Sequence, residues 1–290
     1  MALRTAILGV GLIGGSIGLA LRRDGWPVTG WGPREGSLKE ALRCGAIERI
    51  AASVQDAVED AELVIAAGPI RSLPAVFRSI ARAARAGTVV TDVGSVKGQV
   101  LRWAAELLPD RLHFVGGHPM AGKEVQGVGA ADANLLCGCT YCLVPGSDRG
   151  LTIVRQLVAA VGARPLIVSA DDHDRAVAAA SHLPFLIATA LIKTVAPELE
   201  DLTGMVAASG FRDTTRVAMA SPAMHADICN FNSLALREVI SRFESALGEL
   251  RSQLDEAAIE QAFEQAARAR QAWGRTRAGA NRQTDLFVVP

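Results

Sequence analysis

The stretch "ILGVGLIGGS", residues 7–16, decides the fold of the N-terminal part of the chain. Its glycines have the G-x-G-x-x-G spacing, and they lie between a strand-like apolar run and a helical pattern at 12–23. In such a turn the first glycine permits a sharp bend, the second lets the backbone approach a pyrophosphate, and the third lets helix and strand pack closely. The stretch therefore predicts a dinucleotide site at a helix N-terminus, and a glycine-rich turn without a ligand is the alternative. The predicted cofactor-binding residues here are Gly9, Gly11, Leu12, Ile13 and Gly14.

Short apolar runs and helical patterns continue to alternate up to residue 169. Strand followed by helix, repeated, predicts a mostly parallel sheet with helices on both faces, which binds ligands beyond the carboxyl ends of its strands. We therefore expect a Rossmann-like α/β domain over residues 1–169. Its further strand-like runs lie at 27–31, 62–68, 87–94, 113–117, 140–144 and 164–169.

Helical patterns replace the strand pattern from residue 170. They cover 171–196, 222–231 and 234–273, and the last carries an apolar stripe that needs a partner. We expect an all-α domain over 170–273 that forms a homodimer, followed by a loose tail at 274–290. A monomer that buries the stripe internally is the alternative.

Composition and charge argue against several classes of protein. Thirty basic residues balance thirty acidic ones, so no net field favours nucleic acid or an anionic membrane. The chain begins without a secretory leader pattern, and we interpret the apolar segment 176–192 as a buried helix of a soluble, cytoplasmic protein, because it is slightly short and too polar for a membrane span. The cluster "CGCTYC" at 137–142 lacks a matching Cys or His pair, so we expect no metal site.

The end of the second predicted strand bears on the choice of dinucleotide. An NAD enzyme usually places Asp or Glu there, about twenty residues beyond the glycine motif. In "VTGWGPREG", 28–36, Gly32 stands at that position and Arg34 follows two residues later. Without a carboxylate nothing repels a 2′-phosphate, and a guanidinium can bind one bidentately. We therefore predict NADP with Arg34 at its 2′-phosphate; NAD, with Arg34 as an ordinary surface residue, is the alternative.

The stretch "GGHPMAGKE", 116–124, places His118 just after the fifth predicted strand, where a nicotinamide would lie. Removal of hydride from a carbinol carbon requires a base for the hydroxyl proton, and neutral imidazole suits that role. In "DVGSVK", 92–97, Ser95 follows the preceding strand and faces the same crevice. The alternative is a helix-capping serine and a histidine in a turn.

Motifs spread along most of the chain resemble those of the prephenate and arogenate dehydrogenases of tyrosine biosynthesis. The resemblance runs from about residue 4 to about residue 255. It implies oxidative decarboxylation of a cyclohexadienol, in which hydride leaves the carbinol carbon for the nicotinamide, the ring carboxylate departs as CO2 and the ring becomes aromatic. The motifs, in order, are "GVGLIGGS", "DVGSVK", "GGHPMAGKE", "HD" at 173–174, "SHLP" at 181–184 and "GFRDTTRVA" at 210–218.

The resemblance also implies roles for individual residues. His118 would be the base, Ser95 would orient the same hydroxyl, and Arg216 would grip a carboxylate of this small-molecule substrate. The other matched positions are two charged residues at the substrate entrance, a supporting histidine and a pocket histidine, namely Glu124, Asp213, His173 and His182.

Phe185 departs from the family pattern. Many prephenate-specific relatives have His-Leu-Pro-His where this chain has "HLPF" at 182–185. The loss of an imidazole removes a donor and, when it is protonated, a positive charge that would repel an ammonium group. Because arogenate carries an amino acid and prephenate a keto acid, the chain is expected to favour arogenate with NADP. An NAD-linked prephenate dehydrogenase, an enzyme for a 4-amino-4-deoxy analogue and a dinucleotide-sensing module without turnover are the alternatives.

Overall fold

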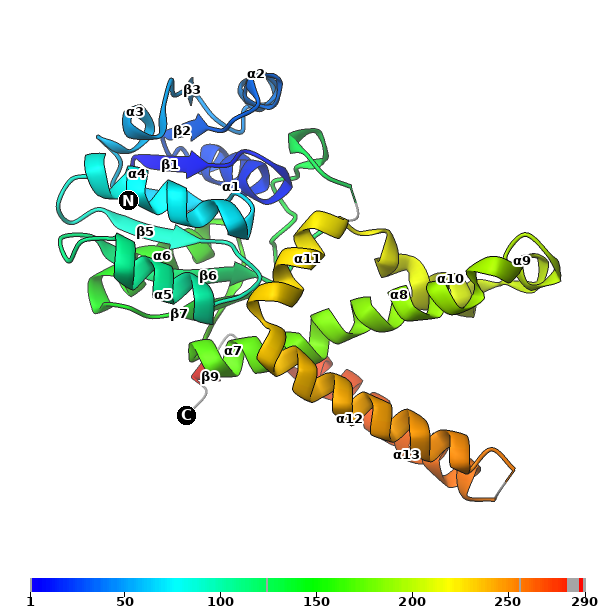
Figure 1. Ribbon diagram of the computed structural model, residues 1–290. Coiled ribbons are helices and arrows are strands. Elements are labelled where there is room, and N and C mark those ends of the chain that lie inside the picture. The colour runs from blue at the N-terminus through cyan, green and yellow to red at the C-terminus, as the bar shows by residue number, and fades with distance from the viewer. Residues whose placement is uncertain (1, 124, 256, 281–286, 289–290) are drawn as a thin grey trace.

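The computed structural model describes residues 2–123, 125–255, 257–280 and 287–288. Within them a nine-stranded sheet forms the middle of the body from which the helical projections extend (Figure 1). The strand order is β3-β2-β1-β4-β5-β6-β7-β8-β9, and all neighbours are parallel except β6 and β7. The order reverses between β1 and β4, so the crevice at their carboxyl ends is the expected ligand site. The strands are β1 (Thr5–Leu8), β2 (Val28–Trp31), β3 (Arg49–Ile50), β4 (Leu63–Ala66), β5 (Val89–Asp92), β6 (His113–Pro119), β7 (Thr140–Val144), β8 (Arg164–Ile167) and β9 (Phe287–Val288).

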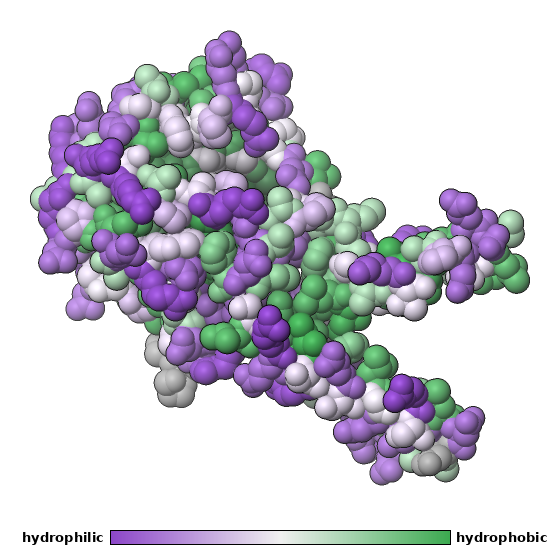
Figure 2. All heavy atoms as spheres, in the orientation of Figure 1, coloured by the Kyte–Doolittle hydropathy of each residue, from purple (hydrophilic) through white to green (hydrophobic). Residues whose placement is uncertain are grey.

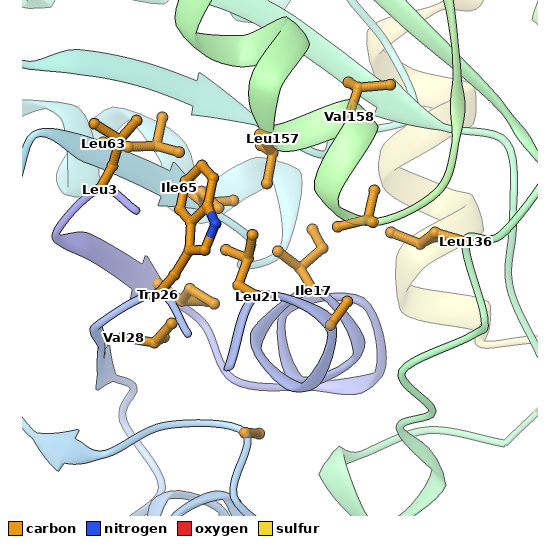
Figure 3. Close-up of a cluster of buried hydrophobic side chains, with 14 of the residues drawn as sticks. Leu3, Ile17, Leu21, Trp26, Val28, Leu63, Ile65, Leu136, Leu157 and Val158 are labelled. Carbon is orange, nitrogen blue, oxygen red and sulfur yellow. The ribbon is translucent and has the colours of Figure 1, made fainter. Parts of the chain in front are cut away.

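Apolar side chains on both faces of the central strands hold helices to the sheet. Because successive strand residues point to opposite faces, Ile7 and Ile65 join one buried cluster with α1 and α6, whereas Leu8 and Val64 join a second cluster with α3, α4 and α5. Figure 3 shows part of the first cluster around Trp26. The helices are α1 (Leu12–Arg23), α2 (Glu35–Arg43), α3 (Val54–Val58), α4 (Leu73–Ala83), α5 (Gly98–Leu107) and α6 (Asp148–Ala160), with short 3-10 turns η1 (Ile70–Ser72) and η2 (Val128–Ala130).

Helices with short connections make up the described residues between 170 and 280. In Figure 1, α8 to α10 form one projection from the sheet domain and α12 with α13 forms another. A π-helical turn, η3 (Ala178–His182), joins the first two helices of this part. The elements are α7 (Ala170–Val177), α8 (Leu183–Val195), η4 (Ala196–Glu198), α9 (Leu202–Val206), α10 (Ser209–Thr215), η5 (Arg216–Met219), α11 (Pro222–Phe231), α12 (Ser233–Ser252) and α13 (Ala258–Ala280).

The predicted single helix over 234–273 is wrong. α12 ends at Ser252, and Gln253 has φ −99° and ψ 2°, which is outside the helical region. The Ser252 hydroxyl donates back to the Glu249 carbonyl, a local bond by which serine competes with helix propagation. Residues 274–280 continue α13 instead of starting a tail, and Phe287–Val288 pair with β8.

The apolar stretch around α8 differs from its prediction as a buried helix. Ala170–Glu198 is one continuous helical stretch; its most apolar 18-residue window has a mean hydropathy of 1.6, and 22% of that window is buried within the single chain. Its length and composition would allow a membrane span, but the stretch contains His173 and His182, which are both buried against other parts of the molecule. Figure 2 shows apolar side chains gathered where the projections leave the sheet domain.

Candidate active site

The glycine turn after β1 has the geometry of a phosphate cradle. Gly9 has φ +111°, and a Cβ there would lie 2.7 Å from the backbone of Ala67; a Cβ on Gly14 would lie 2.2 Å from the Gly9 oxygen. A Cβ on Gly11 would meet nothing within 4 Å. α1 begins at this open position without a side-chain cap or an acidic residue in its first turn. The backbone at this N-terminus is therefore open to the approach of an anion such as a pyrophosphate, and no side chain of the first turn competes for its N–H groups.

The end of β2 lies beside this turn and carries no unengaged carboxylate. A Cβ on Gly32 would lie 4.0 Å from the Val10 nitrogen, so the two loops are neighbours. Arg34 is exposed at the N-cap of α2. The one acid of the first turn, Glu35, is 2.7 Å from Lys39. An exposed guanidinium beside the cradle is compatible with a 2′-phosphate.

The glycine pair before His118 lets β6 pass very close to β5. A Cβ on Gly117 would lie 2.5 Å from the Asp92 carbonyl oxygen. The Gly117 N–H donates to Asp92 Oδ1 at 3.0 Å, and Lys97 Nζ donates to the Gly117 carbonyl at 2.6 Å. Lys97 also forms a fully buried ion pair with Asp92. These contacts fix the backbone that carries His118, which lies within β6 and beyond the last pairing of β5 with β6, rather than after the strand as predicted.

His118, His173 and Asp174 form a chain of hydrogen bonds, which we call the histidine relay. His118 Nδ1 is 2.9 Å from His173 Nε2, and His173 Nδ1 is 2.8 Å from Asp174 Oδ1. Asp174 also accepts the backbone N–H groups of Lys97 at 2.7 Å and Gly98 at 2.8 Å. Its carboxylate thus lies at the N-terminus of α5, where the helix dipole favours negative charge. The relay joins β6 to α7.

The relay sets the tautomer of the terminal imidazole. Burial alone would raise the pKa of Asp174, but the hydrogen bonds from His173 and the helix N–H groups hold it below its usual range. A carboxylate only accepts, so the proton of His173 lies on Nδ1 and its Nε2 must accept from His118 Nδ1–H. Burial, followed by the nearby His173, Lys97 and His182, keeps the pKa of His118 well below that of a free imidazole. His118 is therefore neutral with a bare Nε2 lone pair, which is the state of a general base.

A second buried histidine lies next to the relay. The Asn232 amide donates to the Asp174 carbonyl at 2.8 Å and lies 3.3 Å from His182 Nδ1. Burial lowers the pKa of His182 to about 4, so this ring is also neutral. His182 ends the π-helical turn, and Pro184 follows in the first turn of α8. Because proline lacks an N–H and clashes with the preceding helical turn, the wider π turn accommodates it, and such turns are common at functional sites.

Phe185 stacks on a histidine from another helix. Its ring centroid lies 3.6 Å from that of His225 with an interplanar angle of 14°. Nδ1 of His225 is 3.1 Å from the Ser221 carbonyl oxygen at the start of α11. The same helix is tied to the loop after β4, because Arg71 makes hydrogen bonds of 2.6–2.9 Å to both oxygens of the buried Asp227.

The other predicted residues are more peripheral. Ser95 is half-buried in the loop between β5 and α5, and no hydrogen bond or ring contact within the described part of the chain links it to the relay. Asp213 is exposed and lies 3.7 Å from Arg212. Arg216 is exposed on η5, which packs against α8. Glu124 lies outside the described residues.

Several residues of the site were not predicted. Lys97 and Asp92 belong to the quoted motif "DVGSVK" and Asp174 to "HD"; the available signal was a charged residue at each end of the first motif and an acid directly after a histidine in the second. His225 and Asn232 carried no such signal, because only the fold of α11 brings them to the site. Among the residues that the structure describes, no group of three His, Cys, Asp or Glu side chains is placed to hold a metal ion.

Two family models together match most of the chain. The nucleotide-binding domain of prephenate dehydrogenase matches residues 17–167, and the dimerization domain of prephenate dehydrogenase matches residues 169–267. Among curated proteins, the prephenate dehydrogenase of Bacillus subtilis (strain 168) is 34% identical over 252 residues, covering 84% of this chain and 67% of the relative. The cyclohexadienyl dehydrogenase of Zymomonas mobilis is 32% identical over 255 residues, covering 85% and 87%.

Solved structures are similar over nearly the whole chain. The prephenate dehydrogenase of Aquifex aeolicus in complex with hydroxyphenyl propionate and NAD+ superposes with a TM-score of 0.86 at 29% identity, covering 92% of this chain and 97% of that one. The arogenate dehydrogenase of Synechocystis gives a TM-score of 0.79 at 27% identity, covering 93% and 99%.

Proposed function

The chain belongs to the prephenate dehydrogenase family, and from this premise we propose that it oxidises and decarboxylates a cyclohexadienol, with hydride transfer to a nicotinamide dinucleotide. The neutral His118 with its bare Nε2 is the observation that carries the proposal. We propose a homodimer in which residues 1–169 hold the cofactor and residues 170–273 complete the substrate site. The exposed apolar side chains of the helical part support the dimer, among them Leu202, Met205, Val206, Leu247, Phe263 and Trp273.

His118 Nε2 takes the proton of the ring hydroxyl while hydride leaves the carbinol carbon. The resulting imidazolium is stabilised through the relay, because His173 and the Asp174 carboxylate polarise its Nδ1–H. The bound dinucleotide supplies the hydride acceptor. The ring carboxylate then leaves as CO2, and aromatisation makes the reaction irreversible.

We propose the remaining roles from the motifs that this chain shares with the family. We propose that Ser95 orients the hydroxyl, that Arg216 binds a substrate carboxylate, and that Glu124 and Asp213 lie around the entrance. His173 supports the base, and His182 with Phe185 lines the pocket. The half-buried position of Phe185 next to His182 and the exposed position of Arg216 beside α8 are compatible with these roles.

We propose NADP as the preferred cofactor and arogenate as the preferred substrate. The absence of an unengaged acid at the end of β2 and the exposed Arg34 support NADP. The test is steady-state kcat/KM for arogenate and prephenate, each with NADP and NAD, from the absorbance of the reduced nicotinamide. The proposal expects the highest value for arogenate with NADP; equal or better use of NAD contradicts the cofactor assignment.

Arg34→Asp tests the cofactor assignment directly. A carboxylate at this position repels a 2′-phosphate and accepts from a ribose hydroxyl, so the ratio of kcat/KM with NADP to that with NAD should fall by about 10–100-fold. Arg43→Asp, an exposed arginine at the far end of the same helix, is the matched control and should leave the ratio unchanged. An unchanged ratio in Arg34→Asp would show that Arg34 does not contact the phosphate.

A further inference from the structure

Phe185 and His225 lie next to His182, the buried histidine beside the relay. Phe185 lies one helical turn beyond His182 on α8, and His225 stacks on it from α11. The nearby His225 also contributes, after burial, to the lowered pKa of His182, so the two imidazoles are neighbours. A cyclohexadienol carries its side chain at the end of the ring opposite its hydroxyl, so a residue that contacts this side chain must lie away from His118; His225 is the candidate, because it adjoins the buried His182 and stacks on Phe185.

The imidazole of His225 is held in one hydrogen-bonding state. The Ser221 carbonyl only accepts, so the proton of the neutral ring lies on Nδ1 and a lone pair lies on Nε2. Burial lowers the pKa of His225, which favours the neutral ring. Within the described part of the chain, Nε2 of this half-buried ring has no hydrogen-bond partner.

Contacts in the middle of α11 and directly after its C-terminus fix the position of this acceptor. The bidentate Arg71–Asp227 pair anchors the helix two residues after His225 to the loop that follows β4. Asn232, directly after the helix, bonds to the Asp174 carbonyl and to His182. The stacked Phe185 covers one face of the ring. His225 is therefore oriented before any ligand arrives.

We propose that His225 selects the substrate side chain, with Nε2 accepting a hydrogen bond from the ammonium group of an amino-acid side chain while Phe185 holds the ring in place. The inference rests on the proposed function and names the residue that makes it specific. An α-keto acid offers only acceptors at this position, so its complex leaves the Nε2 lone pair unsatisfied. Sites built to bond a substrate N–H discriminate strongly against analogues that lack it.

The test compares kcat/KM for arogenate and prephenate in two variants at this residue. His225→Phe preserves an aromatic stack but removes the acceptor, and a charge-assisted hydrogen bond is worth about 10–100-fold, so kcat/KM for arogenate should fall by that factor while that for prephenate changes by less than about threefold. His225→Gln places an amide oxygen near the position of Nε2 and should retain more of the preference. His113→Gln, at the opposite end of β6 and bonded to Ser147, is the matched control and should behave as wild type.

Each outcome is decisive. Loss of arogenate turnover in His225→Phe with prephenate turnover preserved supports the assignment. Equal losses on both substrates, no loss on either, or a wild type that prefers prephenate would overturn it. A wild type that turns over neither substrate would refute the proposed function itself, and this role with it. Thermal unfolding in the presence of NADP identifies a variant that fails to fold, in which case the ratio in His225→Gln decides.

Discussion

Asp174→Asn should impair the proposed base, His118, although Asp174 does not contact His118 directly. Asp174 Oδ1 accepts from both His173 Nδ1 and the Lys97 N–H, and Oδ2 accepts from the Gly98 N–H. An amide has one oxygen, so whichever way it turns, its NH2 group faces a donor. If the NH2 group faces His173, it reverses the proton order along the relay and leaves Nε2 of His118 protonated. In the other orientation the negative charge that stabilises the imidazolium is still lost.

The size of the effect follows from these bonds. The charge-assisted bond to His173 is worth about 1.5–3 kcal/mol, and stabilisation of the imidazolium through it is worth about as much again. The barrier should therefore rise by about 3–6 kcal/mol, which lowers kcat by about 10²–10⁴-fold. KM for the substrate and Kd for the cofactor should change little, because Asp174 reaches the reacting atoms only through His173 and His118.

The assay is kcat at saturating substrate and NADP, with cofactor binding followed by tryptophan fluorescence to show that the variant is folded. Asp172→Asn is the matched control, since Asp172 lies on the same helix but has a side chain that is 41% exposed and bonds to Ser169 and Arg175 rather than to the relay. The control should keep kcat within about threefold of wild type, as for other exposed surface changes. If Asp174→Asn also stays within about tenfold, the relay does not set the state of His118 and the reasoning is wrong.

Other predictions concern the same site. His118→Asn should lower kcat by about 10²–10⁴-fold and leave cofactor binding intact, whereas a dinucleotide sensor would lose nothing in its binding response. Lys97→Met leaves the buried Asp92 carboxylate without its partner and should reduce the free energy of unfolding in urea by about 3–5 kcal/mol; a loss below 1 kcal/mol would mean that the charge is screened. The folded-state pKa of His182, lowered to about 4 by burial, means that the unfolded chain binds its proton first as pH falls. Stability should therefore drop by roughly 3 kcal/mol between about pH 7 and pH 4, and His182→Gln should show a correspondingly flatter profile.

Local sequence patterns were sufficient to predict elements that a single short stretch of the chain determines. The glycine turn, the first helix at 12–23 and the helix at 222–231 are observed at their predicted bounds. β3 and α3, of two and five residues, were missed because such short elements give almost no periodicity; α2, of nine residues, was missed as well. The prediction of one helix over 234–273 was wrong because the apolar stripe continues on both sides of Gln253. The polar residues at this point end α12, which the stripe alone does not indicate.

The candidate site likewise contains residues that motifs predict and residues that only the fold brings together. His118, His173 and His182 were predicted from motifs, and the structure brings them together. The stacked pair of Phe185 and His225 could not be predicted, because residues 40 positions apart meet only through the packing of α11. Phe185 replaces the imidazole that many relatives carry at this position. The structure nevertheless has an imidazole there, because His225 of α11 stacks on Phe185.

The relay crosses from β6 to α7, so the two parts of the chain share one reactive group. A dinucleotide-binding domain cut off after β8 would keep its glycine cradle and the Asp92–Lys97 pair, but His118 would lose His173 and, through it, the Asp174 carboxylate that sets its tautomer. We expect such a fragment to bind the dinucleotide but to have no dehydrogenase activity. Exchange of this domain between dehydrogenases of similar architecture would likewise transfer cofactor choice but not catalysis, unless α7 moved with it. The smallest unit that can be recombined as an enzyme is therefore longer than the nucleotide-binding domain.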